Sequence, residues 1–152
     1  MLTLLIVLCG KYLIWLVVLA GAAFVLIAPD KQEYLLVLLA SAVLAYASAR
    51  VAGALWYDPL PFVTGNFTPL IPHAANNGFP SDHGLLSGVI ASVVWLYNRR
   101  WGTLLWLCAL VIGLARIAAG IHHTVDVAAA FLIAVAAAYA VRLAYHTFVK
   151  QH

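Results

Sequence analysis

Residues 13–27 read LIWLVVLAGAAFVLI, fifteen positions without a single charged side chain. A helix needs about 20 mostly apolar residues to cross the hydrocarbon core of a bilayer, and the apolar residues before this run supply the remaining length. Gly10 and Lys11 interrupt the longer apolar stretch from Leu2 to Ile27, and this stretch stops at Pro29. We therefore expect a first membrane span within Leu2–Ile27, with the first ten residues either part of the span or a separate turn at the interface.

The composition of the whole chain supports a membrane protein. Of its 152 residues, 66% are hydrophobic and 9% are charged, and the mean hydropathy is +1.02. Soluble domains are roughly half apolar and about a quarter charged. A water-soluble fold of this length could not hide so much apolar surface. We expect an all-α fold, a polytopic integral membrane helix bundle that forms one domain over residues 1–152.

Four further apolar stretches complete a bundle of about five transmembrane helices. They are expected at Glu33–Tyr57, Pro80–Tyr97, Trp101–Ala119 and Thr124–Val149. The polar, proline-punctuated connection Asp58–Phe79 is too hydrophilic for a span and forms the longest loop.

The distribution of basic residues predicts the orientation. Lys31, Arg99, Arg100 and Lys150 fall in the first connection, the third connection and the C-terminus, whereas Asp58–Phe79 contains no lysine or arginine. Because cytoplasmic loops carry the excess of basic residues, the long loop is expected outside. We predict a multi-pass protein of the plasma membrane whose histidine-rich loops face away from the cytoplasm.

Other partners receive little support from the sequence. The net charge of +3 is small and scattered, which argues against nucleic acid as a partner. Cys9 and Cys108 lie in apolar stretches, so we expect buried small side chains there and neither a disulfide nor a metal site.

The first polar cluster is Phe79-Pro80-Ser81-Asp82-His83-Gly84. Proline suits the first turn of a helix and serine can cap it. The free amides of such a turn, with the helix dipole, favour an anion such as phosphate. His83 stands in this turn and could donate a proton. Alone, the cluster fits a simple helix cap beside an interfacial histidine better than an anion site.

The second cluster contains Arg116, His122 and Asp126. His122 and Asp126 are four residues apart and share one face if a helix begins there. A carboxylate that accepts from one imidazole nitrogen leaves the other free to attack phosphorus. Arg116 offers a planar fork of donors that matches phosphate oxygens. His123 is a second candidate for the nucleophile, although its spacing to Asp126 is less favourable.

Together these residues resemble the motifs of the type 2 phosphatidic acid phosphatase superfamily, PSxH and SRx5Hx3D. Pro80-Ser81-Asp82-His83 matches the first of these motifs. Arg116, His122 and Asp126 match the second, with Ala115 in place of its serine. The runs Pro59–Val63, Leu70–Ala75 and Phe79–His83 are similar to the bacitracin-resistance branch, the undecaprenyl-diphosphate phosphatases.

The resemblance implies a lipid phosphatase that needs no metal and no cofactor. His122 would attack phosphorus and form a phosphohistidine, and Asp126 would orient it. His83 would protonate the leaving oxygen and then help to activate water. Arg116 and Ser81 would hold the phosphate oxygens, and Asp82 of the same turn is counted with this phosphate-binding set.

The family motif Kx6RP is degraded in this chain. Gly53 stands at the lysine position and Leu60 at the arginine position, so two phosphate-binding cations are missing. Arg50 lies one helical turn before Gly53 on the same face and could replace the lysine, and His73 could contribute if protonated. Nothing in the sequence replaces the arginine.

The expected substrate is undecaprenyl diphosphate, which would be hydrolysed to undecaprenyl phosphate. Another lipid phosphate, such as phosphatidic acid or phosphatidylglycerol phosphate, is the alternative within the same chemistry. The degraded motif also allows a catalytically weak relative that binds lipid head groups.

Overall fold

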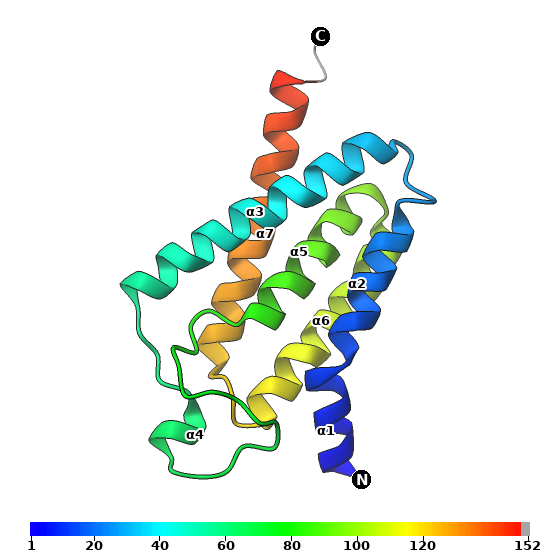
Figure 1. Cartoon of the computed structure of the whole chain (residues 1–152). Helices are drawn as coiled ribbons and strands as arrows, with labels where there is room; N and C mark the ends of the chain where they lie inside the picture. The colour runs from blue at the N-terminus through cyan, green and yellow to red at the C-terminus, as the bar shows by residue number, and fades with distance from the viewer. Residues whose placement is uncertain (150–152) are drawn as a thin grey trace.

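A computed structural model of the chain shows a helical bundle, and it describes residues 1–149 (Figure 1). Lys150, which contributes to the predicted orientation, lies outside the described residues. The helices are α1 (Leu2–Lys11), α2 (Leu13–Phe24), α3 (Lys31–Leu55), α4 (Pro61–Thr64), α5 (Asp82–Tyr97), α6 (Arg99–Ala118) and α7 (Thr124–Phe148).

Four segments within the described residues are long and apolar enough to cross a membrane. They are Leu2–Phe24, which joins α1 and α2, and the helices α3, α6 and α7. The first ten residues are therefore helical and continue the first span, with a break at Tyr12 between α1 and α2. The all-helical membrane fold expected from the sequence is confirmed, and the observed boundaries lie within a few residues of the predicted ones.

The helix α5 is the central pass, and it is shorter than the four other segments that cross the bundle. Its 16 residues extend about 24 Å, but it is surrounded by α2, α3, α6 and α7. Most positions from Gly84 to Val94 are buried, so lipid does not need to cover this helix. Small residues allow the close approach: a Cβ at Gly88 would lie 2.9 Å from Ala134 of α7, as is common between membrane helices.

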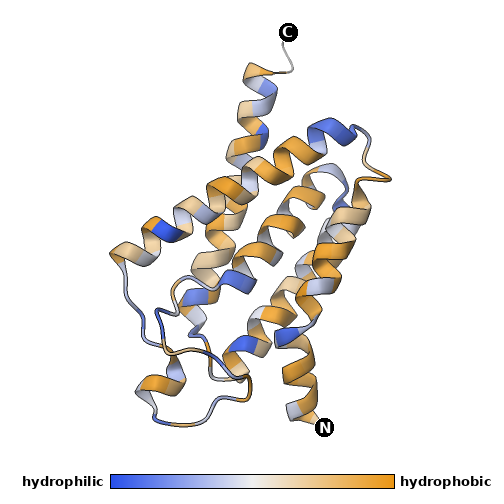
Figure 2. Ribbon diagram, viewed as in Figure 1, coloured by the Kyte–Doolittle hydropathy of each residue, from blue (hydrophilic) through white to orange (hydrophobic). Residues whose placement is uncertain are grey.

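The described residues cross the bundle five times, so the start of α1 and the end of α7 lie at opposite ends of the bundle (Figure 1). The α2–α3 connection and the α5–α6 turn share one end, and the long loop with α4 shares the other end with the start of α7. Many large hydrophobic residues are exposed, and the hydrophilic segments of the ribbon lie mainly toward the two ends (Figure 2). This arrangement agrees with the odd number of passes predicted from the basic residues.

The long loop is held against the end of α3 by Asn77. Its side-chain oxygen accepts from the backbone N–H groups of Asp58 and Phe79, each at 3.0 Å. Its amide nitrogen donates to the carbonyls of Gly53 and Trp56 at 2.9 and 3.0 Å. These four contacts place the residues before α5 next to the C-terminal end of α3.

Candidate active site

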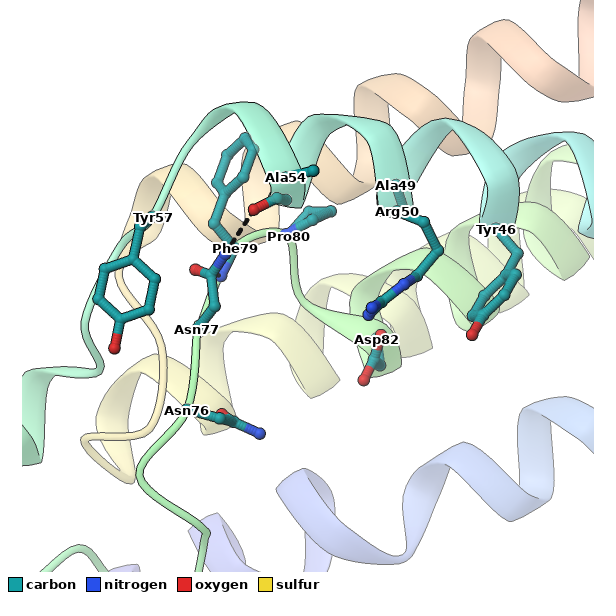
Figure 3. Close-up of a pocket in the computed structure, with 11 residues that line it drawn as sticks. Tyr46, Ala49, Arg50, Ala54, Tyr57, Asn76, Asn77, Phe79, Pro80 and Asp82 are labelled. Carbon is teal, nitrogen blue, oxygen red and sulfur yellow. Dashed lines mark hydrogen bonds between the residues drawn. The ribbon is translucent and has the colours of Figure 1, made fainter.

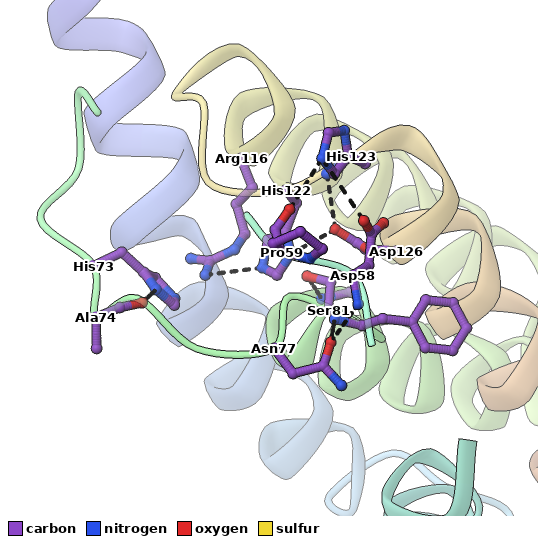
Figure 4. Close-up of polar contacts among 12 residues, drawn as sticks. Asp58, Pro59, His73, Ala74, Asn77, Ser81, Arg116, His122, His123 and Asp126 are labelled. Carbon is purple, nitrogen blue, oxygen red and sulfur yellow. Dashed lines mark hydrogen bonds and ion pairs between the residues drawn. The ribbon is translucent and has the colours of Figure 1, made fainter. Parts of the chain in front are cut away.

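The two imidazole nitrogens of His122 have different partners (Figure 4). Nδ1 lies 3.3 Å from Oδ2 of Asp126, and Nε2 lies 3.3 Å from Nη2 of Arg116. A carboxylate can only accept and a guanidinium can only donate. The proton of the neutral ring therefore sits on Nδ1, and Nε2 carries a lone pair.

The helix α7 starts at the site and fixes Asp126. His123 caps this helix, and its backbone N–H donates to Oδ2 of Asp126 at 2.8 Å. The backbone carbonyl of Asp126 accepts from the N–H of Ser81 at 3.2 Å, which ties the start of α7 to the start of α5. Asp126 is fully buried and His122 is 4% exposed, so the pair is shielded from bulk solvent.

Burial also determines the charge state of His122. Removal from water lowers the pKa of its imidazole below the ordinary 6.5, and the hydrogen bond and charge of Asp126 act in the opposite direction. The ring is therefore neutral at pH 7, which is the state that can act as a nucleophile.

Arg116 comes from the last turn of α6 and is 4% exposed. Besides its contact with His122, it donates from Nη1 to the backbone carbonyl of Gly10 at 3.2 Å. Its Nε has no partner among the described residues. A buried guanidinium with a donor left over is suited to bind an incoming anion.

The start of α5 adds the third wall of the site. Ser81 caps the helix and accepts from the N–H of Gly84 at 3.4 Å. His83 lies within electrostatic range of Arg116, His122 and His73. The structure thus brings together the two polar clusters that the sequence separates by one pass out and back through the bundle.

His73 from the long loop lies beside His122 (Figure 4). Its ring is 6.1 Å from that of His122, edge to face, although its Nδ1 contacts the carbonyl of Ala74 at 2.9 Å. His123 points elsewhere, with Nε2 3.3 Å from the carbonyl of Pro59. Geometry therefore favours His122 over His123 as the nucleophile.

The two positions that lack the family cations differ in their surroundings. Leu60 is fully buried. It lies close to Gly78 and Asp126, because a Cβ added at Gly78 would lie 2.7 Å from Cδ2 of Leu60 and 3.2 Å from Oδ2 of Asp126. It fills space beside the site and offers no donor. Gly53 instead borders an open cavity, where a Cβ would lie 2.9 Å from the carbonyl of Phe79.

That cavity lies beside the site and contains Arg50 (Figure 3). It has a volume of about 350 Å³ between the C-terminal half of α3 and the residues that lead into α5. The side chains of Arg50 and Asp82 point toward each other across it (Figure 3). Asp82 in turn lies within electrostatic range of Arg116.

Two contributors to the site were not anticipated from the sequence. The carbonyl of Gly10 is a backbone group, for which side-chain patterns give no signal. Asp58 lies 3.9 Å from Nε2 of His123, and the pKa of its carboxyl is raised by burial and by the neighbouring charge of Asp126. The acid that begins the long loop Asp58–Phe79 is the signal that could have identified it.

Comparison with known proteins identifies the family of the chain. The PAP2 superfamily matches residues 34–150. The chain belongs to this superfamily. Within residues 1–149, no group of three or more histidine, cysteine, aspartate or glutamate side chains could hold a metal ion.

Three curated relatives come from bacteria. The chain is 36% identical over 97 residues to the bacitracin transport permease protein BcrC of Bacillus licheniformis, covering 63% of this chain and 48% of that protein. It is 38% identical over 80 residues to the undecaprenyl-diphosphatase BcrC of Bacillus subtilis, covering 53% and 42%. It is 33% identical over 98 residues to the putative undecaprenyl-diphosphatase YbjG of Escherichia coli, covering 64% and 49%. The chain thus spans about half the length of the curated relatives it matches.

Two solved structures share the fold. LpxE of Aquifex aeolicus superposes with a TM-score of 0.71 at 23% identity, covering 91% of this chain and 81% of that one. The first transmembrane PAP2-type phosphatidylglycerolphosphate phosphatase from Bacillus subtilis gives 0.60 at 20% identity, covering 97% and 76%. The second superposition leaves out only 3% of this chain, so it includes most of α1 and α2, which the superfamily match leaves out.

Proposed function

We propose that this protein hydrolyses a lipid diphosphate, with undecaprenyl diphosphate as the substrate and undecaprenyl phosphate as the lipid product. The observation that carries the proposal is the position of His122 between Asp126 and Arg116, which leaves its lone pair on the side of the cationic group. Similarity to proteins named undecaprenyl-diphosphatase supports the choice of lipid.

In the first step, Nε2 of His122 attacks the terminal phosphorus. A bond forms between Nε2 and phosphorus, and the bond to the bridging oxygen breaks. Its electron pair goes to this oxygen, which leaves with the lipid phosphate. His83 is protonated beside the anionic substrate, whose negative charge favours the imidazolium, and gives its proton to this oxygen. Asp126 stabilises the imidazole as positive charge develops on it.

Arg116 has to change partners during this step. Without substrate, its Nη2 faces the lone pair of His122. A bound phosphate competes for the same donor, and its charge favours the exchange. The exchange frees the lone pair of His122 and places the guanidinium against the oxygens that gain charge in the transition state. Ser81 and the first amides of α5 complete the anion pocket.

In the second step, water hydrolyses the phosphohistidine. His83, now neutral, takes a proton from the water, whose oxygen attacks phosphorus as the bond to Nε2 breaks. Inorganic phosphate leaves and the neutral His122 is restored.

The proposal also includes the side of the membrane, with the site at the outer face of the plasma membrane. The absence of lysine and arginine from Asp58–Phe79 supports this orientation.

The proposal is tested by phosphate release from undecaprenyl diphosphate in detergent, with a chelator present. The protein is expected to release phosphate, and His122→Ala is expected to lower the rate by about four orders of magnitude or more. His123→Ala is the matched control, because its backbone contact with Asp126 survives the substitution. It should keep most of the activity.

Parallel assays with phosphatidic acid and phosphatidylglycerol phosphate separate the possible substrates. A higher rate on either monoester would replace the proposed substrate. The loss of cations at Gly53 and Leu60 favours one further candidate, a relative that binds lipid head groups without turnover. That candidate predicts no phosphate release from any of the three lipids, and no effect of His122→Ala.

A further inference from the structure

The cavity beside the nucleophile pocket has features of a second anion site. Unlike the apolar cavity between α2 and α3, which is lined by residues such as Trp15, Val18 and Leu38, it combines a guanidinium with phenol and amide groups. The polar lining residues are Tyr46, Arg50, Tyr57, Asn76, Asn77 and Asp82. Its volume of about 350 Å³ lies in the range of small-ligand pockets.

The cavity offers the guanidinium of Arg50 a polar surrounding within the spanning helix. It lies five residues before the end of the spanning helix α3. An ionisable side chain within a membrane span is costly unless it faces a polar or water-filled space, and such residues mark functional sites. No hydrogen bond or ion pair of Arg50 is found among the described residues at normal contact distances. The guanidinium is therefore available to a ligand that enters the cavity.

We infer that Arg50 binds the proximal phosphate of a lipid diphosphate, the phosphate that leaves with the lipid when the terminal one is transferred to His122. This inference rests on the proposed function and adds a preference for diphosphates over monophosphates. It differs from a role in which Arg50 replaces the missing lysine on the reacting phosphate.

The direction of the reaction supports this placement. In phosphoryl transfer the attacking and leaving atoms lie roughly in line with phosphorus. The attacking atom is Nε2 of His122, and the proton donor for the leaving oxygen is His83 at the start of α5. Asp82, the neighbour of His83, lines the cavity that holds Arg50. The leaving phosphate is thus directed from His83 toward Arg50.

Charge supports it as well. A diphosphate group carries more negative charge than a monophosphate, and Arg116 alone is a small counter-charge once the cations of the family motif are lost. Arg50 points toward Asp82 across the cavity (Figure 3), and Arg116 lies within electrostatic range of the same carboxylate. A diphosphate that reaches both guanidinium groups would compete with Asp82 for them. Two cations near one carboxylate then match two linked phosphates.

The test uses the full chain in detergent with farnesyl diphosphate and farnesyl phosphate, which share a tail and differ by one phosphate. Arg50→Gln is expected to lower kcat/KM for the diphosphate by about 10- to 100-fold, the effect of losing a hydrogen bond to a charged group. The monophosphate rate should change less than about threefold. Arg50→Lys keeps the charge and should restore part of the diphosphate rate. Arg99→Gln, an exposed arginine at the other end of the bundle, is the control and should change neither rate.

Equal losses on both substrates would overturn the inference in favour of a role at the reacting phosphate. Unchanged rates on both would overturn it outright. Binding gives a second readout that does not require turnover. Pyrophosphate should raise the unfolding temperature more than orthophosphate does, and Arg50→Gln should reduce the pyrophosphate shift to the size of the orthophosphate shift. If the protein hydrolyses neither farnesyl compound, the proposed function fails, and the pyrophosphate result still decides whether Arg50 forms an anion site.

Discussion

At the scale of single residues, the site depends on which nitrogen of His122 carries the proton. Asp126 can only accept and Arg116 can only donate, so their positions on opposite sides of the ring fix one tautomer. Burial keeps the ring neutral. A directed lone pair on Nε2 of His122 thus follows from two neighbours and a low exposure.

Asp126→Asn should lower kcat by about 10³- to 10⁴-fold, because an amide does not enforce the same tautomer or stabilise the charged ring. The pH profile should also move. Activity requires neutral His122, so kcat/KM falls as the pH drops through the pKa of this group, which burial places below 6.5. Asp126 raises that pKa, so its replacement should shift the acidic limb to lower pH.

This shift is measured as log kcat/KM against pH from about 4 to 9. A wild-type acidic limb whose midpoint lies above pH 6.5 would contradict the assignment of His122. So would an Asp126→Asn limb at an unchanged pH, because a purely structural role of Asp126 would lower the rate without moving the profile.

The sequence predicted these residues unevenly. His122 and Asp126 could be paired because a spacing of four residues places two side chains on one face of a helix. The partner of Arg116 could not be read in the same way, because a loop separates it from His122 and its second contact is a backbone carbonyl. Arg50 was correctly placed on the face of Gly53, but the cavity it lines depends on how Asn77 holds the long loop.

At the scale of elements, the break between α1 and α2 contributes to the site. The last carbonyls of a helix lack the amide partners that a continuing helix would supply. α1 ends at Lys11, and the carbonyl of Gly10 in its last turn accepts from Arg116. Gly10 is the one buried residue of α1, and a Cβ there would lie 3.5 Å from that of Ala115 on α6. Ala115, which departs from the family motif, thus faces the first span.

Gly10→Leu should push α1 away from α6 and weaken the contact with Arg116. Even a Cβ at this position would lie 2.8 Å from Cδ1 of Ile71. We expect kcat to fall about 10- to 100-fold, the effect of one hydrogen bond to a charged group. Leu8→Ala, at an exposed position of the same helix, is the matched control and should leave kcat within about twofold, since exposed substitutions have small effects.

A double-mutant cycle separates positioning from general damage. If Gly10 acts through Arg116, the Gly10→Leu substitution should cost little in an Arg116→Lys background, because coupled residues are not additive. The same fold loss in both backgrounds would show that Gly10 contributes to the packing of α1 alone.

The central helix shows where the pattern of the sequence was sufficient and where it was not. An apolar run from Pro80 to Tyr97 predicted a span, and α5 occupies Asp82–Tyr97. Hydropathy could not show that this helix is enclosed by four others. Its enclosure explains how 16 residues serve as a pass, and why serines and glycines are tolerated along it.

At the scale of the whole molecule, charged residues gather at two ends with different chemistry. The end opposite the site contains a buried contact between Glu33 and Arg142, with the hydroxyl of Tyr97 donating to Glu33 at 3.1 Å. Arg99 lies 3.7 Å from the ring of Trp95 at the same end. These contacts join α3, α5, α6 and α7, whereas the charges at the site end lie around a pocket.

This asymmetry leads to a prediction for the orientation in the membrane. The end with Lys31, Arg99 and Arg100 should face the cytoplasm, since basic connections remain inside. The long loop should face outward. Single cysteines at exposed positions test this, Thr68→Cys in the long loop and Gln32→Cys at the start of α3, with Cys9 and Cys108 replaced by alanine. On intact cells, a membrane-impermeant maleimide should label Thr68→Cys at once and Gln32→Cys only after permeabilisation. The reverse order would place the pocket at the cytoplasmic face, and a lipid carrier in the outer leaflet could then not be its substrate.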